Sequence, residues 1–229
     1  RERLGGTWDL FRYPGIRSDS DMYTLGYNFK PWTSRRAIAD APSILNYLNE
    51  TVDEYDLQDK IHFNRKVVDA SWSSETALWT VSLQHGDGSL STIQCNFLHM
   101  CSGYYSYDEG HNPDFPGKAD FAGPIVHPQF WPEDLDYAGK KVVVIGSGAT
   151  AVTLVPSMAD TAEHVTMLQR SPTYIVSRPG EDKWALRLRK VLPAKLAYLL
   201  TRWKNVLMGI FMFNLARKKP AGFKQRLLE

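Results

Sequence analysis

Residues 141–151 read KVVVIGSGATA, an apolar run that ends in glycines and continues into an alanine-rich segment. Residues 142–145 are apolar without alternation, which is typical of a strand buried on both faces. Gly146 suits a tight turn, and Gly148 has no Cβ, so a phosphate group can approach the backbone. A helix that begins at Ala149 would point its N–H groups and positive dipole end at that anion.

The segments that follow the glycines fit a βαβ unit that binds a dinucleotide. The pattern predicts a helix over 149–159 and a second strand over 164–169. Ala151 stands where a third glycine often lets the helix pack closely on the strand. The predicted pyrophosphate-binding residues are Gly146, Ser147, Gly148, Ala149, Thr150 and Ala151.

The residues after the second strand distinguish NAD from NADP. An NAD site places Asp or Glu there, about twenty residues past the glycines, to bind the ribose hydroxyl. This chain has Gln169, Arg170 and Ser171 instead. Because a guanidinium binds a 2′-phosphate through two hydrogen bonds, we predict NADPH, held by Arg170 and Ser171. The alternative is a nucleotide-free doubly wound domain with a chance glycine turn.

The charge of the chain is unevenly distributed. The 229 residues carry a net charge of +2, but residues 183–229 hold 12 Lys and Arg and a single acid. The apolar stretch 206–213 inside this basic segment is too short to span a bilayer. A basic amphipathic helix is compatible with an anionic membrane surface, although packing on another part of the protein is the favoured interpretation. No nucleic-acid recognition module accompanies the charge, so nucleic acid is disfavoured as a partner.

The two cysteines, Cys95 and Cys101, provide no disulfide framework, and nothing resembles a secretory signal. We expect buried thiols and a cytoplasmic setting. Elsewhere the pattern predicts a helix over 39–56, capped by Asp40 or Ser43. Short strands are predicted at 61–63, 66–70, 77–83, 91–95 and 96–101, with a β-meander among them.

Three further clusters precede the glycine turn. They are GGTW at 5–8 followed by RYPGIRSD at 12–19, CSGYY at 101–105, and FAGPIVHPQFWP at 121–132. In this order, and followed by G-x-G-x-x-A, they closely resemble the class B flavin-dependent monooxygenases of the Baeyer–Villiger and flavin-containing monooxygenase group. The similarity is greatest to the ethionamide-activating branch, and it extends to about residue 205.

The resemblance implies an enzyme that binds both FAD and NADPH. In this family NADPH reduces the flavin, O2 reacts at flavin C4a, and the resulting peroxyflavin delivers one oxygen atom to a small organic substrate. The substrate is a ketone that becomes an ester, or a sulfur or nitrogen compound; Trp131-Pro132 at the end of the third cluster favours ketones. The sequence leaves the oligomeric state open, and no metal site is expected.

The resemblance also implies an α/β fold with two doubly wound (Rossmann-like) dinucleotide-binding domains, both incomplete, and a small β-meander in the first. Residues 1–135 would form an FAD-binding domain without its N-terminal βαβ unit, because the family's first glycine motif precedes Gly5. Residues 139–229 would form the N-terminal part of the NADPH-binding domain. We expect such a fragment to bind FAD poorly and to be inactive.

Individual roles follow by position within the matching motifs. The resemblance places Asp19 close to flavin and nicotinamide, and His127 in the fingerprint with Gly123 and Trp131. We take Asp19 and His127 as candidate catalytic residues, against alternatives in which Asp19 caps a turn and His127 is a structural histidine. The remaining expected flavin-side contacts are Gly6, Thr7, Trp8, Tyr13, Pro14, Tyr23 and Gly103.

Two other functions remain open from the sequence. A flavin disulfide reductase needs a redox pair, usually C-x-x-C or C-x4-C, whereas five residues separate Cys95 from Cys101. A non-catalytic nucleotide-binding fragment is the second alternative.

Overall fold

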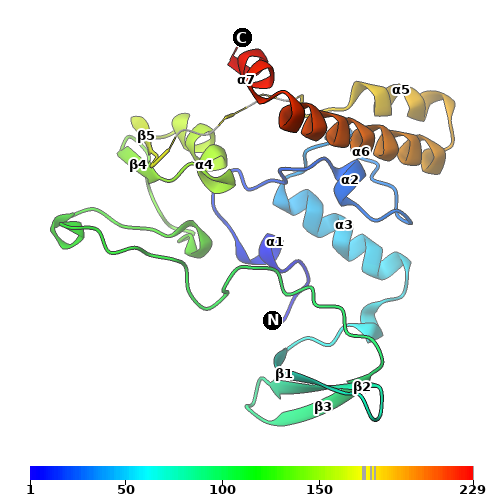
Figure 1. Ribbon diagram of the computed structural model, residues 1–229. Coiled ribbons are helices and arrows are strands. Elements are labelled where there is room, and N and C mark those ends of the chain that lie inside the picture. The colour runs from blue at the N-terminus through cyan, green and yellow to red at the C-terminus, as the bar shows by residue number, and fades with distance from the viewer. Residues whose placement is uncertain (172–173, 176, 178, 229) are drawn as a thin grey trace. The chain divides into compact units, whose positions relative to one another are not determined.

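The computed structural model describes residues 1–171, 174–175, 177 and 179–228 (Figure 1). These residues form two units. The first contains residues 1–10 and 45–127, and the second contains residues 11–44 and 128–229. The domain boundaries expected from the sequence, 1–135 and 139–229, stay a prediction, because a compact unit need not coincide with a folding domain.

The first unit is built on an antiparallel meander of three strands. They are β1 (Arg65–Ser73), β2 (Leu78–His85) and β3 (Leu90–Cys95), in the order β1-β2-β3. Trp72 pairs with Trp79 across β1 and β2, and their ring centroids lie 5.6 Å apart. Val81 and Leu83 of the central strand are buried. The predicted β-meander is confirmed. The unit also contains α1 (Thr7–Leu10), η1 (Gln58–Lys60) and η2 (Lys118–Asp120).

Two predicted strands of this unit are wrong. At residues 61–63, Ile61 N–H bonds Gln58 O and closes a 3₁₀ turn, and Asn64 then has a φ of 54°, outside the β region. Residues 96–101 form no strand. Strand β3 ends at Cys95, which pairs with Trp79, and β2 begins at Leu78, so β2 has almost no residues left to pair with a longer β3. Without a neighbouring strand, an apolar run cannot join a ladder.

The expectation of buried thiols is also wrong. Cys95, at the end of β3, is half-buried, and Cys101 is exposed in the coil that follows. The side chains around them, Phe97 and Met100, are 81% and 62% exposed. The missing strand explains both results, since an unpaired segment has no sheet to lie against.

The second unit contains the predicted βαβ motif. Strands β4 (Lys141–Ile145) and β5 (His164–Leu168) are parallel, with Val142 opposite Val165, and α4 (Ala149–Ala159) connects them. Leu154 and Met158 of α4 are buried, as is Ala151 in its first turn. The helix has the predicted bounds, and the α/β fold class is confirmed.

The expected burial of β4 on both faces is wrong. Val143 and Ile145 are 59% and 61% exposed, and Leu168 of β5 is 56% exposed. Val142 and Val144, which point to the other face, are half-buried. Alternate residues of a strand point to opposite faces, and within the described residues only one face of this two-stranded sheet is covered.

The rest of the second unit is largely helical. It contains α2 (Met22–Leu25), η3 (Pro128–Phe130), α5 (Lys183–Val191), α6 (Ala194–Lys218) and α7 (Pro220–Leu228). Helix α3 (Ala41–Glu54) begins here and continues into the first unit, and Asp40 caps it by accepting from Ser43 N–H at 2.9 Å. Of the two predicted caps, Asp40 is therefore the one observed.

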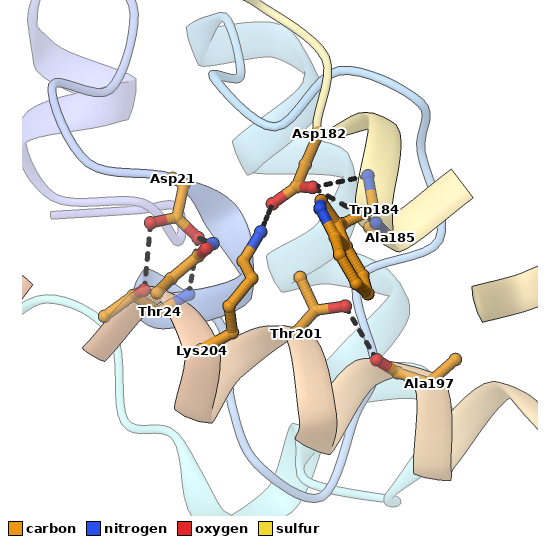
Figure 2. Close-up of polar contacts among 9 residues, drawn as sticks. Asp21, Thr24, Asp182, Trp184, Ala185, Ala197, Thr201 and Lys204 are labelled. Atoms are coloured by element: carbon orange, nitrogen blue, oxygen red, sulfur yellow. Dashed lines mark hydrogen bonds and ion pairs between the residues drawn. The ribbon is translucent and has the colours of Figure 1, made fainter. Parts of the chain in front are cut away.

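A partly buried ion pair attaches α6 to the start of α5 (Figure 2). Lys204 Nζ lies 2.6 Å from Asp182 Oδ2, while Asp182 Oδ1 accepts from the backbone N–H groups of Trp184 and Ala185. Arg202 Nη1 donates to the carbonyl oxygens of Tyr23 and Gly26, which fixes α2 on the same helix. Among the described residues, no helix combines the length and apolar character that crossing a membrane requires.

Candidate functional site

The glycine turn after β4 offers an open site for an anion. Gly146 has a φ of 128°, and its N–H donates to Leu168 O at 2.8 Å. A Cβ on Gly148 would meet no atom within 4 Å. Gly148 is the N-cap of α4, and as a glycine it has no side chain that could bond the first N–H groups of the helix. The first N–H groups of this 11-residue helix are thus placed to bind phosphate.

Arg170 and Ser171 follow β5 at the same sheet edge as the glycine turn. Parallel strands bring their carboxyl ends together, and the Gly146–Leu168 hydrogen bond ties these two ends to each other. Both side chains are exposed. This arrangement fits a dinucleotide whose pyrophosphate lies on α4 and whose 2′-phosphate is bound by Arg170. The two residue assignments stay predictions.

A β-turn from the N-terminal segment packs directly against α4. Ile16 N–H bonds Tyr13 O at 3.3 Å around Pro14 and Gly15, and Gly15 has a φ of 74°. These are the features of a type II turn with proline and glycine at its centre. A Cβ on Gly15 would collide with Ser157 Oγ and approach Ser157 Cβ to 2.9 Å. Gly15 was not among the predicted site residues, although the Pro-Gly pair is a recognisable turn pattern.

This turn brings Tyr13 to the first turn of α4. The Tyr13 ring is 8% exposed and packs against Phe11, with 6.1 Å between the ring centroids. Burial raises the pKa of the Tyr13 hydroxyl, a hydrogen bond with the Thr150 side chain opposes that shift, and the nearby charge of Asp19 adds to it. Three predicted site residues, Tyr13, Asp19 and Thr150, therefore lie together.

Asp19 itself is exposed, but the chain beside it is fixed. Ser18 is buried, its N–H donates to Ala39 O at 2.8 Å, and its Oγ accepts from Ala39 N–H at 3.1 Å. An exposed carboxylate on an anchored backbone suits a group that meets a bound ligand. Its catalytic role stays a prediction.

Tyr23 lies in the interior of the second unit. It is 1% exposed, and its ring packs against Tyr198 of α6 with 6.1 Å between the centroids. Burial raises the pKa of the Tyr23 hydroxyl, and the Arg189 guanidinium opposes that shift. Its assignment as an FAD contact stays a prediction, and its visible contacts are those of a core residue.

The first unit holds Gly6, Thr7 and Trp8, at the start of α1. All three are half-buried, and Gly6 has a φ of 52°. Next to them, the buried Asp9 carboxylate accepts a hydrogen bond from Arg1 at 2.7 Å, a pair that was not predicted from the sequence. Gly103 also belongs to this unit and is exposed, with a φ of 72° and no atom near its Cβ direction.

The fingerprint at 121–132 is divided between the units. His127, in the first unit, is half-buried, and its ring lies so close to Gly110 that a Cβ there would overlap it. Trp131, in the second unit, is half-buried and meets Tyr137 edge-on, with 6.2 Å between ring centroids. Gly123 lies against the Phe121 ring. These are packing contacts between side chains and the backbone or neighbouring rings. The catalytic assignment of His127 stays a prediction.

Comparison with known proteins agrees with this geometry. Residues 37–218 match the family model described as flavin-binding monooxygenase-like. This chain belongs to the flavin-binding monooxygenase-like family. That result confirms the resemblance noted from the sequence, and the family match runs through both the meander and the βαβ motif.

Several curated monooxygenases are similar to this chain in sequence. The chain is 57% identical to the FAD-containing monooxygenase EthA of Mycobacterium tuberculosis over 229 residues, which are all of this chain and 47% of EthA. It therefore spans about half the length of the curated relatives it matches.

Solved structures show the same fold. The structure of OTEMO in complex with FAD and NADP matches with a TM-score of 0.66 and 30% identity, over 87% of this chain and 38% of OTEMO. Cyclohexanone-bound cyclohexanone monooxygenase matches with a TM-score of 0.65 and 29% identity, over 82% of this chain and 37% of that enzyme.

Proposed function

We propose that the complete protein is an FAD monooxygenase that uses NADPH and O2 to insert one oxygen atom into a small organic substrate. The main support is the open glycine turn at Gly146–Gly148 together with Arg170 at the same sheet edge, in a chain of the flavin-binding monooxygenase-like family. That combination fits NADPH better than NADH. The residues after β5 provide a guanidinium, which suits a 2′-phosphate, and they do not provide the carboxylate that would bind the ribose hydroxyl of NADH.

The chain's own residues would bind and orient the cofactors. The first turn of α4 would hold the pyrophosphate, and Arg170 with Ser171 would hold the 2′-phosphate. Tyr13, Pro14 and Asp19 would line the flavin side of the nicotinamide, with Gly6, Thr7, Trp8 and Gly103 as further flavin contacts. When bound, NADPH supplies the hydride that reduces FAD, and the reduced flavin activates O2.

A ketone is the proposed substrate class. Trp131-Pro132 at the end of the fingerprint favours it, and one solved relative is described as cyclohexanone-bound. A flavin disulfide reductase is not favoured, because Cys95 and Cys101 lack the spacing of a redox pair and the family match is to monooxygenases. A cytoplasmic setting, and a peripheral membrane contact through the basic C-terminal helices, are also proposed.

Turnover by the complete protein tests this proposal. Purified flavoprotein is given NADPH in an oxygen electrode, either alone or with cyclohexanone, a dialkyl sulfide or a disulfide, and the products are separated by gas chromatography. We expect ketone-dependent O2 uptake equal to NADPH oxidation, and a lactone product. Oxygenation of a sulfide but not the ketone would move the assignment to sulfur chemistry. NADPH-dependent reduction of a disulfide without O2 uptake would refute it.

A further inference from the structure

Three polar side chains stand on one face of α6. Tyr198, Arg202 and Asn205 are four and three positions apart, the spacing at which the side chains of a helix lie above one another. All three donate hydrogen bonds to the segment 21–27, from residues that are 171 to 184 positions further along the chain. We call these three residues the α6 clamp.

Arg202 and Tyr198 hold the end of α2. Arg202 Nη1 donates to Gly26 O at 2.7 Å and to Tyr23 O at 3.0 Å. The Tyr198 hydroxyl donates to Tyr27 O at 2.9 Å. The last carbonyl groups of a helix have no partner within the helix, so a guanidinium is a suitable donor for them. Because α2 has only four residues, too few to be stable alone, its position depends on these contacts.

Asn205 holds the start of the same short helix. Asp21 is the N-cap of α2, and its carboxylate accepts from the N–H and the hydroxyl group of Thr24 at 3.1 and 2.9 Å (Figure 2). Asn205 Nδ2 donates to Asp21 Oδ1 at 2.9 Å. Both ends of α2 are therefore fixed to α6.

Asp19 lies between the α6 clamp and a second anchor. On one side of Asp19, the buried Ser18 donates its N–H to Ala39 O at 2.8 Å and accepts from Ala39 N–H at 3.1 Å. On the other side, Asp21 carries the bond from α6. Asp19 and Ser20 are the two residues between these anchors, and both are exposed. Hydrogen bonds on both sides thus restrict the backbone that carries the Asp19 carboxylate.

The restricted carboxylate belongs to the surroundings of the nucleotide turn. Asp19 is close enough to Tyr13 for its charge to act on the Tyr13 hydroxyl. That hydroxyl in turn lies next to Thr150, in the first turn of α4. The α6 clamp therefore fixes the backbone of a charged group that faces the predicted cofactor site.

We propose that the α6 clamp positions the Asp19 carboxylate for the reaction at the flavin. This inference rests on the proposed monooxygenase function. Tyr198, Arg202 and Asn205 are positioning residues, because they act through the backbone on either side of α2. A displacement of about 1 Å in a group at the reacting centre can slow a reaction by about two orders of magnitude. Loss of a clamp bond keeps the carboxylate but frees it to move.

Flavin reduction in the complete protein tests this proposal. The rate at which NADPH reduces bound FAD is measured without oxygen in a stopped-flow spectrophotometer. We expect Asn205→Ala to slow this step about threefold and Arg202→Lys about tenfold. Asn205→Asp places a second carboxylate against Asp21, so it should be slower than Asn205→Ala.

A double-mutant cycle with Asp19→Asn distinguishes positioning from a general loss of stability. If the clamp acts through Asp19, adding Asn205→Ala to Asp19→Asn should change the rate by less than about twofold. An equal loss in both backgrounds would overturn the proposal, because the clamp would then act independently of the carboxylate.

A binding measurement gives a second readout that needs no turnover. Titration with NADP+ should change the absorption spectrum of bound FAD. We expect Asn205→Ala to alter that difference spectrum in the same way as Asp19→Asn, with FAD content and melting temperature unchanged. If Arg202→Lys loses FAD, Asn205→Ala decides the question, because it removes one hydrogen bond of a half-buried side chain. A wild-type difference spectrum for Asn205→Ala would count against the proposal.

Asn214→Ala is the matched control. Asn214 lies on the same helix but donates to Ile210 O of α6 itself at 2.9 Å, so its loss should leave the rate and the spectrum unchanged. An effect as large as that of Asn205→Ala would overturn the proposal. A wild type that NADPH does not reduce would refute the proposed function and this inference together. Normal reduction of both the wild type and the clamp variants would refute this inference alone.

Discussion

The Tyr13 hydroxyl lies next to the side chain of Thr150, although one residue belongs to the N-terminal segment and the other to the first turn of α4. The contact is enclosed, since the Tyr13 ring is 8% exposed. A residue expected beside the flavin is therefore joined to the turn expected to hold NADPH. We therefore expect the position of one cofactor to affect the binding of the other.

Removing either hydroxyl should weaken NADP+ binding by the complete protein. We expect Tyr13→Phe and Thr150→Val each to raise the Kd of NADP+ about fivefold, the effect of one lost hydrogen bond. The double variant should be no worse than either single variant, because both remove the same interaction. Thr150→Ser keeps the hydroxyl and should bind NADP+ like the wild type, and Ser157→Ala, about two turns further along α4, serves as the control. Additive losses, measured by calorimetry, would argue against a shared bond.

Gly15 is expected to tolerate no side chain. Gly15→Ala must adopt a φ of 74° and also displace Ser157, so we expect a loss of at least about 2 kcal/mol in the free energy of unfolding. Gly139→Ala is the matched control, because Gly139 has a φ of 63° but open space around it. It should cost only about 1 kcal/mol. Urea denaturation measures both values, and equal losses would show that the Gly15 turn is not tightly packed on α4.

The Asp182–Lys204 pair should make stability depend on pH in the acid range. Burial alone would raise the pKa of Asp182, but hydrogen bonds from Lys204 and from the α5 backbone outweigh it and hold the pKa below its ordinary value of 3.8. A carboxylate with a lowered folded pKa stabilises fully above its unfolded pKa and loses that effect as pH falls through the folded value.

Asp182→Asn keeps a helix cap but removes the charge. We expect it to lower the free energy of unfolding by about 1 kcal/mol at pH 7, and the difference from wild type should shrink below pH 3.8. Glu181→Gln breaks the exposed neighbouring pair with Arg35 and should leave the free energy of unfolding nearly unchanged, because water screens that pair. A difference between wild type and Asp182→Asn that is constant with pH would contradict the ion-pair explanation.

Arg170 is expected to determine the choice of cofactor. Arg170→Ala should weaken NADPH binding by about 1.5–3 kcal/mol and leave NADH binding nearly unchanged, because only NADPH carries the 2′-phosphate. Arg170→Lys keeps the charge without the paired geometry and should give an intermediate loss. Steady-state KM values for both cofactors provide the measurement. An unaltered ratio of the two KM values would remove Arg170 from the phosphate site.

Local pattern was enough to predict the βαβ motif and the meander. A glycine turn between an apolar strand and a helix is set by residues adjacent in sequence, so the bounds of α4 followed from residues 149–159 alone. Strand pairing is a longer-range property. The apolar run at 96–101 has strand composition, yet β2 has no residues left to pair with it, and no local feature reveals that.

By itself, the sequence determined the α/β class, the motif order that marks the monooxygenase family, and the residue types at the dinucleotide turn. Each depends on short stretches whose backbone preferences are local. Only the tertiary structure decided that Tyr13 meets Thr150, that Gly15 has no room for a Cβ, and that Lys204 pairs with Asp182. Those results depend on which distant segments pack together, and packing is fixed by shape and burial across the whole unit.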